Sequence, residues 1–197
     1  MTIPDYAEAP PEHPTEWLDR WLTEAEKSGE LNHTAMVLST LNAEGAPRAR
    51  FVLCKGVTAD GVRFFTNLES DKGHELAGDS RVAIALYWSI LKRQVRIEGT
   101  VTQMSDAEAD EYFASRSRLS NVGAWASQQS RPIASRVELE TAVESVSNQY
   151  GEVVPRPPHW TGFHVHASRW EFWQDQAGRI HDRWTMVPNG DGWTMWR

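Results

Sequence analysis

Residues 81–104 read RVAIALYWSILKRQVRIEGTVTQM. Two runs rich in apolar and β-branched residues, 81–88 and 92–104, are separated by only three residues. In the second run Gln94, Arg96 and Glu98 alternate with apolar residues, and side chains two positions apart share one face of a strand. The two runs therefore predict a β-hairpin, which implies an antiparallel sheet.

Similar patterns occur on both sides of this hairpin. Further strands are predicted at 34–41, 47–55, 61–67, 162–173, 179–187 and 192–197. Helices are predicted at 15–28, 71–78, 105–115 and 134–149, with Ser70 as a cap of the second and the capping box Ser105–Glu108 opening the third. This order predicts a mainly β fold with flanking helices, an antiparallel barrel in a single domain, 14–197, after a flexible tail, 1–13.

The composition argues against several classes of function. The chain has 197 residues, 40% hydrophobic and 24% charged, which is typical of a globular protein. Its formal net charge of -7 argues against nucleic acid or an anionic membrane as the main partner. Cys54 is the single cysteine, so an internal disulfide and a cysteine-based zinc site are excluded. His164 and His166 alternate without a third ligand, so we expect structural roles and no metal.

The expected location is the cytoplasm. No apolar run approaches the roughly 20 residues of a membrane span. The first residues, MTIPDYAEAPPEHPTEW, are acidic and proline-rich and do not resemble a signal peptide.

Residues 173–184, WQDQAGRIHDRW, carry three basic side chains at alternating positions. In an extended strand, Arg179, His181 and Arg183 would share one face, where their charges repel one another. Two interpretations are open at this point: a solvated edge strand, or a cationic face that binds an anion. Trp173, the first residue of this segment, is suited to wall a pocket for a planar ligand.

Other polar residues are candidates for binding a phosphate. Tyr112, Arg116 and Ser120 fall at the predicted end of a helix, where they either complement the helix dipole or converge on a phosphate. Arg50 and Lys55 are an odd number of residues apart. They can serve one pocket only through a bulge, or if Lys55 lies past the end of its strand. The chain has no G-x-G-x-x-G or P-loop pattern.

In their order along the chain, these segments resemble the pyridoxamine 5'-phosphate oxidase family, from Thr34 to Arg197. The most specific matches are Arg50 to Lys55, Phe64-Phe-Thr-Asn67, Arg93-Gln-Val95, Gly123 to Ser130, Glu171-Phe-Trp-Gln174 and Arg179-Ile-His-Asp-Arg183. The resemblance implies an FMN-binding split β-barrel and a homodimer with FMN at the interface. It also implies oxidation of pyridoxamine or pyridoxine 5'-phosphate by O2, giving pyridoxal 5'-phosphate and H2O2.

The resemblance assigns roles to individual residues. It implies FMN contacts, partly from the other subunit, by Arg50, Phe51, Val52, Leu53, Cys54, Lys55, Phe65, Thr66, Lys72, Gln94, Gln129, Ser130, Trp173 and Arg183. It implies that the substrate phosphate is held by Lys55, Tyr112, Arg116 and Ser120. Arg179 and His181 are expected over the substrate ring as catalytic residues. The alternating basic residues would then offset the charge of two phosphorylated ligands and a reduced flavin.

The chain departs from the family pattern in two ways that bear on binding. Many relatives carry Ser-Arg-Lys where this chain has Ser70-Asp71-Lys72, so a phosphate contact is lost and a negative charge is added. Relatives often have a basic, aromatic N-terminal lid, whereas Tyr6 is the one candidate aromatic in this tail. Substrate closure is therefore expected to differ.

Two other functions compete with this interpretation. One is a phenazine-biosynthesis flavin oxidase on the same fold, to which Leu86-Tyr87-Trp88 is similar. The other is a flavin-binding protein without turnover. The set Lys55, Tyr112, Arg116 and Ser120 favours a phosphorylated substrate, because a substrate without a phosphate has little use for it.

Overall fold

The computed structural model describes residues 13–197, so the expected tail and Tyr6 lie outside the described residues, except for His13. The strands are β1 (Ala35–Leu41), β2 (Pro47–Leu53), β3 (Gly61–Asn67), β4 (Arg81–Trp88), β5 (Arg93–Gln103), β6 (Trp160–Gln174), β7 (Asp182–Asn189) and β8 (Gly192–Trp196). The helices are α1 (Pro14–Ser28), α2 (Asp71–Gly78), α3 (Asp106–Ala114), α4 (Arg118–Ala126), α5 (Arg136–Gln149) and the 3-10 turn η1 (Ala177–Arg179).

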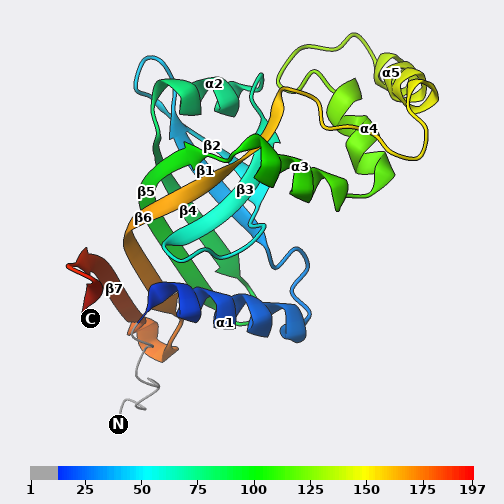
Figure 1. Ribbon diagram of the computed structural model, residues 1–197. Coiled ribbons are helices and arrows are strands. Elements are labelled where there is room, and N and C mark those ends of the chain that lie inside the picture. The colour runs from blue at the N-terminus through cyan, green and yellow to red at the C-terminus, as the bar shows by residue number, and fades with distance from the viewer. Residues whose placement is uncertain (1–12) are drawn as a thin grey trace.

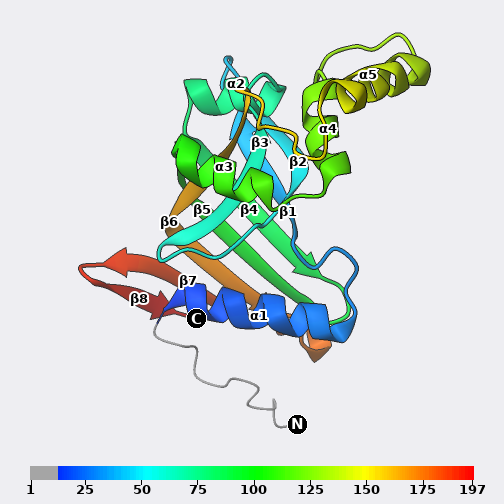
Figure 2. The same ribbon diagram turned by 45° about the vertical axis from the view of Figure 1, so that its right-hand side comes forward.

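One eight-stranded antiparallel sheet forms the body of the protein. Its strands follow the order β2-β1-β4-β5-β6-β7-β8, and β3 pairs with β6 off this path. The sheet curls around an apolar core, with α1 across one end and α2 to α5 at the other (Figure 1, Figure 2). The predicted mainly β fold with flanking helices is therefore confirmed. Among the described residues, no helix is both long enough and apolar enough to cross a membrane.

The hairpin predicted from residues 81–104 is present. β4 and β5 pair from Arg81 opposite Thr100 to Trp88 opposite Arg93. The register of β5 with β6 shifts between Glu98 and Gly99, and the two backbones come close there. A Cβ atom on Gly99 would lie 2.1 Å from the carbonyl oxygen of His166, so this position requires glycine.

Tryptophans of α1 fill one end of the barrel. Trp17, Leu18 and Trp21 are buried, and the ring of Trp17 stacks on Phe172 of β6 with centroids 4.2 Å apart. The helix ends as predicted at Gly29, which has a left-handed φ of +84° and donates its N–H to the last turn. The predicted helix 15–28 is therefore confirmed.

The predicted caps of two further helices are also present. Ser70 Oγ accepts a hydrogen bond from the Gly73 N–H at 3.3 Å and so begins α2. Ser105 and Glu108 form a reciprocal capping box at the start of α3. Helix α2 packs against β1, and α3 packs against β6.

Helix α4 was not predicted from the sequence. Tyr112, Arg116 and Ser120 were expected at the end of the preceding helix. Instead α3 stops at Ala114, and the Ser117 hydroxyl caps a new helix by accepting from the Ser120 N–H. Arg118 then joins α4 to α5 by donating to carbonyl oxygens of Ser147, Tyr150 and Gly151. The two helices form an arm beside the barrel, as Figure 1 shows.

The expected strand across 179–187 is wrong at its start. β6 ends at Gln174 and β7 begins at Asp182, and the two pair with Trp173 opposite Arg183. The chain must therefore reverse between them, and it does so through η1, where Gly178 and Arg179 have φ values of +71° and +62°. Arg179, His181 and Arg183 do not lie along one strand face.

Candidate functional site

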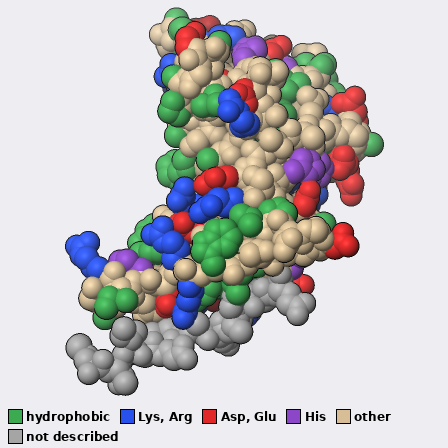
Figure 3. Space-filling view, turned by 90° about the vertical axis from the view of Figure 1, so that its left-hand side faces the viewer, with side chains coloured by type: hydrophobic (Ala, Val, Ile, Leu, Met, Phe, Trp, Pro, Cys, Tyr) green, Lys and Arg blue, Asp and Glu red, His purple; other side chains and the backbone are tan. Residues whose placement is uncertain are grey.

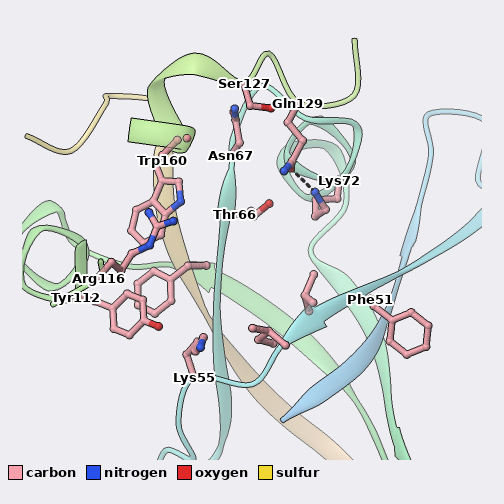
Figure 4. Close-up of a pocket in the computed structure, with 15 residues that line it drawn as sticks. Phe51, Lys55, Thr66, Asn67, Lys72, Tyr112, Arg116, Ser127, Gln129 and Trp160 are labelled. Carbon is pink, nitrogen blue, oxygen red and sulfur yellow. Dashed lines mark hydrogen bonds between the residues drawn. The ribbon is translucent and has the colours of Figure 1, made fainter. Parts of the chain in front are cut away.

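A cavity of about 300 Å³ lies between the barrel and α2 to α4 (Figure 4). Ten of the predicted site residues line it: Phe51, Val52, Leu53, Lys55, Phe65, Thr66, Lys72, Tyr112, Arg116 and Gln129. Five lining residues were not predicted: Asn67, Gly123, Ala124, Ser127 and Trp160. We call this space the main cavity. It brings together side chains from β2, β3, α2, α3, α4 and the start of β6.

Lys55 reaches the main cavity because it lies past the end of β2. The strand stops at Leu53, and the Lys55 N–H then donates to the Arg63 carbonyl oxygen at 2.8 Å. Lys55 thus lies past the end of its strand, but Arg50 does not share the main cavity with it. Cys54 does not line the cavity but is buried in the core, and burial raises the pKa of its thiol.

One wall of the main cavity is a stack of aromatic rings. The ring centroid of Phe65 lies 3.9 Å from that of Tyr112 and 5.0 Å from that of Trp160, and both pairs are nearly parallel. The Arg116 guanidinium lies 4.6 Å from the Trp160 ring centroid. Trp160 follows a proline-rich linker and is the first residue of β6. No motif in the sequence indicated that it lines a cavity.

Arg116 is a half-buried cation with an unused donor. Its Nη2 donates to the Ser120 carbonyl oxygen at 3.0 Å, while Nη1 is buried and has no hydrogen-bond partner among the described residues. Burial lowers the pKa of Arg116, against the opposing influence of Tyr112. Because Arg116 lines the main cavity, its guanidinium suits an anion bound there. Ser120 itself is exposed on α4, and its hydroxyl contacts Ser117 at 2.8 Å rather than the cavity.

Lys72 lies across the main cavity from Arg116 (Figure 4). Its Nζ donates to Gln129 Oε1 at 2.7 Å and lies 3.2 Å from Ser70 Oγ. Burial lowers the pKa of the amine, and the nearby charge of Arg50 lowers it further. The cavity therefore has a cation at each of two separated ends.

Arg50 and Ser130 line a second cavity, which shares Lys72 with the first. Arg50 is bound there by Glu75, whose Oε2 lies 2.6 Å from Nη2. Arg50 and Ser130 were expected in the same site as Lys55, and the structure places them in this second cavity instead.

The remaining predicted residues lie away from both cavities in the described chain. Gln94 of β5, Trp173 of β6 and Arg183 of β7 are direct cross-strand neighbours. His181 lies 4.7 Å from the Trp173 ring and 2.9 Å from Asp175, while Arg179 is exposed in η1. We call these five residues the β7 group. On the face seen in Figure 3, basic side chains gather beside acidic ones in the lower half.

The histidine pair of β6 has structural contacts. His164 lies 3.0 Å from Glu108 of the α3 capping box, and His166 lies 2.5 Å from Asp60. Across residues 13–197, no group of three or more His, Cys, Asp or Glu residues is arranged to hold a metal ion.

Comparisons with known proteins agree with this fold. The family described as "Pyridoxamine 5'-phosphate oxidase" matches residues 22–150, and the "Pyridoxine 5'-phosphate oxidase C-terminal dimerisation region" matches residues 160–197. The crystal structure of PhzG from Burkholderia lata 383, in complex with tetrahydrophenazine-1-carboxylic acid, superposes with a TM-score of 0.91. That chain is 28% identical, and the match covers 100% of this chain and 96% of that one.

Curated relatives are closer in sequence. The pyridoxine/pyridoxamine 5'-phosphate oxidase of Azorhizobium caulinodans is 47% identical over 93% of this chain and 86% of its own length. The enzyme of the same name from Bordetella pertussis is 48% identical over 92% of this chain and 87% of its own length. The fold is thus that of the split-barrel proteins. Within that class, the chain belongs to the pyridoxamine 5'-phosphate oxidase family, which confirms the resemblance seen in the sequence.

Proposed function

We propose that the protein is an FMN-dependent oxidase that converts pyridoxamine 5'-phosphate or pyridoxine 5'-phosphate to pyridoxal 5'-phosphate. The observation that carries the proposal is the half-buried guanidinium of Arg116, which lines a cavity walled by aromatic rings and whose Nη1 has no hydrogen-bond partner among the described residues. An aromatic ligand with a phosphate would bind this guanidinium and stack in the same space.

The two adjoining cavities suit FMN. The main cavity offers planar walls and polar side chains such as Thr66 and Gln129, and the second cavity adds basic groups beside Lys72. FMN has a planar ring system and one terminal phosphate, and the chain lacks the glycine-rich fingerprint of dinucleotide sites. When bound, FMN supplies an acceptor for two electrons and returns them to O2. Release of FAD instead of FMN from the purified protein would contradict this part of the proposal.

The substrate phosphate is assigned to the other end of the main cavity. Lys55, Tyr112 and Arg116 lie on one side of it, apart from Lys72 and Gln129 (Figure 4). Two separated cationic ends match two phosphorylated ligands, which is why this substrate class is favoured. Ser120 contributes to this end of the site through its carbonyl oxygen, which accepts a hydrogen bond from Arg116. Its hydroxyl contacts Ser117 instead of the cavity.

We further propose that the active unit is a homodimer. Phe51 and Tyr87 are 75% and 61% exposed, and they lie on the outer face of the sheet with Val37, which pairs with Phe51, and Ala85, which pairs with Val37. This apolar face borders the main cavity, because Phe51 also lines it. Large exposed apolar patches mark interaction surfaces.

The same face continues across Tyr87 to its neighbour Gln94, and so to the β7 group. A twofold pairing through this face would seat the partner's β7 group at the mouth of the main cavity. The family's dimerisation region, which spans the β7 group apart from Gln94, supports this arrangement.

Ala85→Arg should give a monomer that loses FMN. A wild-type protein that is monomeric by light scattering, yet holds FMN and is active, would contradict the dimer.

The residues of the chain have distinct roles in the proposed reaction. The substrate loses a hydride from its C4' carbon and a proton from the attached amine or hydroxyl group, and O2 takes up these two electrons and two protons to give H2O2. For an amine substrate, water then hydrolyses the imine and releases ammonia. Arg116 and Lys55 anchor the phosphate. Arg179 of the partner subunit caps the outer face of the ring, and His181 of the partner subunit hydrogen-bonds the ring substituents or transfers a proton. The proposal extends to the cytoplasm as location.

The segment Leu86-Tyr87-Trp88, which is similar to phenazine-type oxidases, places no side chain in the main cavity of its own chain. Leu86 and Trp88 are fully buried in the core, and Tyr87 points to the outer face, so none of the three lines the main cavity. The higher identity to the pyridoxine/pyridoxamine 5'-phosphate oxidases also favours the phosphorylated substrate.

Turnover in air tests the proposal. FMN-loaded protein incubated with pyridoxamine 5'-phosphate should form pyridoxal 5'-phosphate and H2O2 in equal amounts. Turnover of a dihydrophenazine carboxylic acid but of neither B6 phosphate would favour the phenazine alternative. No turnover of either, with FMN bound, would indicate a flavin-binding protein without catalysis.

A further inference from the structure

Arg116 lies in the short loop between α3, which ends at Ala114, and α4, which begins at Arg118. Loops are more mobile than the helices and strands that they connect. A side chain that binds a ligand from a loop therefore needs neighbours that hold it in place. If the proposed function holds, the affinity for the substrate phosphate depends on how firmly this loop is held.

Two hydrogen bonds fix Arg116 itself. Its backbone N–H donates to the carbonyl oxygen of Phe113 at 3.2 Å, and its Nη2 donates to the carbonyl oxygen of Ser120 at 3.0 Å. The first acceptor lies in the last turn of α3, and the second lies near the start of α4. The position of the guanidinium therefore depends on where α4 sits relative to α3.

Asn121 fixes the place of α4 relative to α3. Its Nδ2 donates to the same carbonyl oxygen of Phe113 at 3.1 Å. Within residues 13–197, no other hydrogen bond joins a residue of α3 to a residue of α4. Asn121 is only 6% exposed, so water does not compete strongly for this contact. Loss of the amide would remove the polar link between the two helices.

These contacts close a ring around the loop. The carbonyl oxygen of Phe113 holds the backbone of Arg116 and the side chain of Asn121. Ser120, which precedes Asn121 in the chain, holds the guanidinium. The guanidinium carbon of Arg116 also lies 5.1 Å from the centroid of the buried Phe113 ring. Both ends of Arg116, the backbone and the guanidinium, are thus tied to one small cluster.

Only the donor half of the Asn121 amide is used. Its Oδ1 is buried and has no hydrogen-bond partner among the described residues. Burying an unpaired polar atom is costly, so packing alone would favour an apolar residue of similar size at this position. Asn121 does not line the main cavity, so it does not itself touch a ligand bound there. Its amide is therefore explained by the contact that it makes with Phe113.

We propose that Asn121 is a positioning residue for the substrate phosphate. Its amide holds the start of α4 against the end of α3 and so keeps the guanidinium of Arg116 in place. The proposal rests on the proposed function, since it takes Arg116 as the residue that binds this phosphate. It predicts that loss of the amide acts on substrate affinity and acts only through Arg116.

The test is steady-state turnover of pyridoxamine 5'-phosphate by the FMN-loaded protein. Asn121→Leu keeps a similar side-chain size and removes the donor. It should raise KM about three- to tenfold, the loss expected for one buried hydrogen bond, while kcat and FMN content change by less than about twofold. Asn121→Ala, which removes the donor and leaves a gap, should raise KM in the same way.

A double-mutant cycle distinguishes positioning from a general effect on stability. In an Arg116→Ala background, Asn121→Leu should change KM by less than about twofold, because the group that it positions is gone. The matched control is Val122→Ala, since Val122 is the next residue of α4, is 1% exposed and lies outside the main cavity. This variant should have a lower Tm than the wild type, with KM changed by less than about twofold.

The outcomes separate this inference from the function on which it rests. An unchanged KM in Asn121→Leu, an equal rise in the presence and absence of Arg116, or an equal rise in Val122→Ala would overturn the positioning role. Each of these results would leave the oxidase proposal intact, because the wild type still turns over its substrate. A wild-type protein with bound FMN that turns over no B6 phosphate would overturn both.

Discussion

Lys72 and Gln129 are joined by a hydrogen bond of 2.7 Å between Nζ and Oε1. The contact links the first turn of α2 to the loop after α4, 57 residues away along the chain. It places a buried amine where the two cavities meet. The strength of cofactor binding should therefore depend on this amine.

Lys72→Ala should weaken FMN binding by about ten- to a hundredfold. A hydrogen bond to a charged group is typically worth about 1.5–3 kcal/mol, and this amine is buried. Fluorescence titration with FMN measures the change, and Lys27→Ala, an exposed lysine in the last turn of α1, is the control. Equal affinities for the two variants would exclude Lys72 from the flavin site.

Arg116→Ala should mainly weaken the binding of phosphorylated substrate. The lost contact is charge-assisted, so the KM for pyridoxamine 5'-phosphate should rise about ten- to a hundredfold while FMN content is unchanged. Arg118→Ala is the matched control, because Arg118 binds carbonyl oxygens of the α4–α5 arm and lies outside the main cavity. An equal loss for pyridoxamine without its phosphate would show that Arg116 has another role.

Arg179→Ala and His181→Ala should keep FMN but slow its reduction by substrate at least about tenfold, the low end for positioned acid–base groups. In the proposed dimer these side chains reach the partner's cavity, where they would hold the substrate ring. Anaerobic stopped-flow reads the rate from bleaching of the flavin band. Normal rates in both variants would make the β7 group a structural element and not part of the active site.

The α3 capping box should make stability depend on acid pH. Hydrogen bonds from the Ser105 side chain and backbone, and then from His164, lower the pKa of Glu108 to about 2 from its usual 4.5. Because the folded-state pKa is depressed, the stabilisation is fully present above pH 4.5 and is lost as pH falls toward 2.

Thermal unfolding of Glu108→Ala across this pH range measures the effect. Its Tm should lie below that of the wild type at pH 6, and the two should converge as pH falls. Glu111→Ala, an exposed carboxylate of the same helix, should show no such convergence. A Tm difference for Glu108→Ala that is constant with pH would contradict the assignment.

Local signals in the sequence predicted most elements of the fold. The alternation around Gln94 and Arg96, the stop at Gly29 and the caps at Ser70 and Ser105 each depend on neighbours within a few residues. Helix α4 was missed because its cap, Ser117, lies only three residues after the end of α3. In the sequence, the start of α4 therefore looks like the end of α3. The turn through Arg179 was missed because alternating basic residues fit a strand as well as they fit a reversal.

The site was predictable only in part. The family pattern identified ten lining residues of the main cavity, including Lys55 and Arg116. Trp160 and the Glu75–Arg50 pair were missed, because such contacts join residues that are far apart in the sequence and leave no spacing to recognise. Cys54 was placed with FMN by its position in the motif, yet it packs into the core.

The most direct test of the central claim is a single anaerobic turnover. One equivalent of pyridoxamine 5'-phosphate added to FMN-loaded protein should bleach the flavin and give one pyridoxal 5'-phosphate per FMN, and admission of O2 should restore the flavin colour and release one H2O2. Bound flavin that stays oxidised in the presence of both pyridoxamine and pyridoxine 5'-phosphate would contradict the assignment of this chain as a B6-phosphate oxidase.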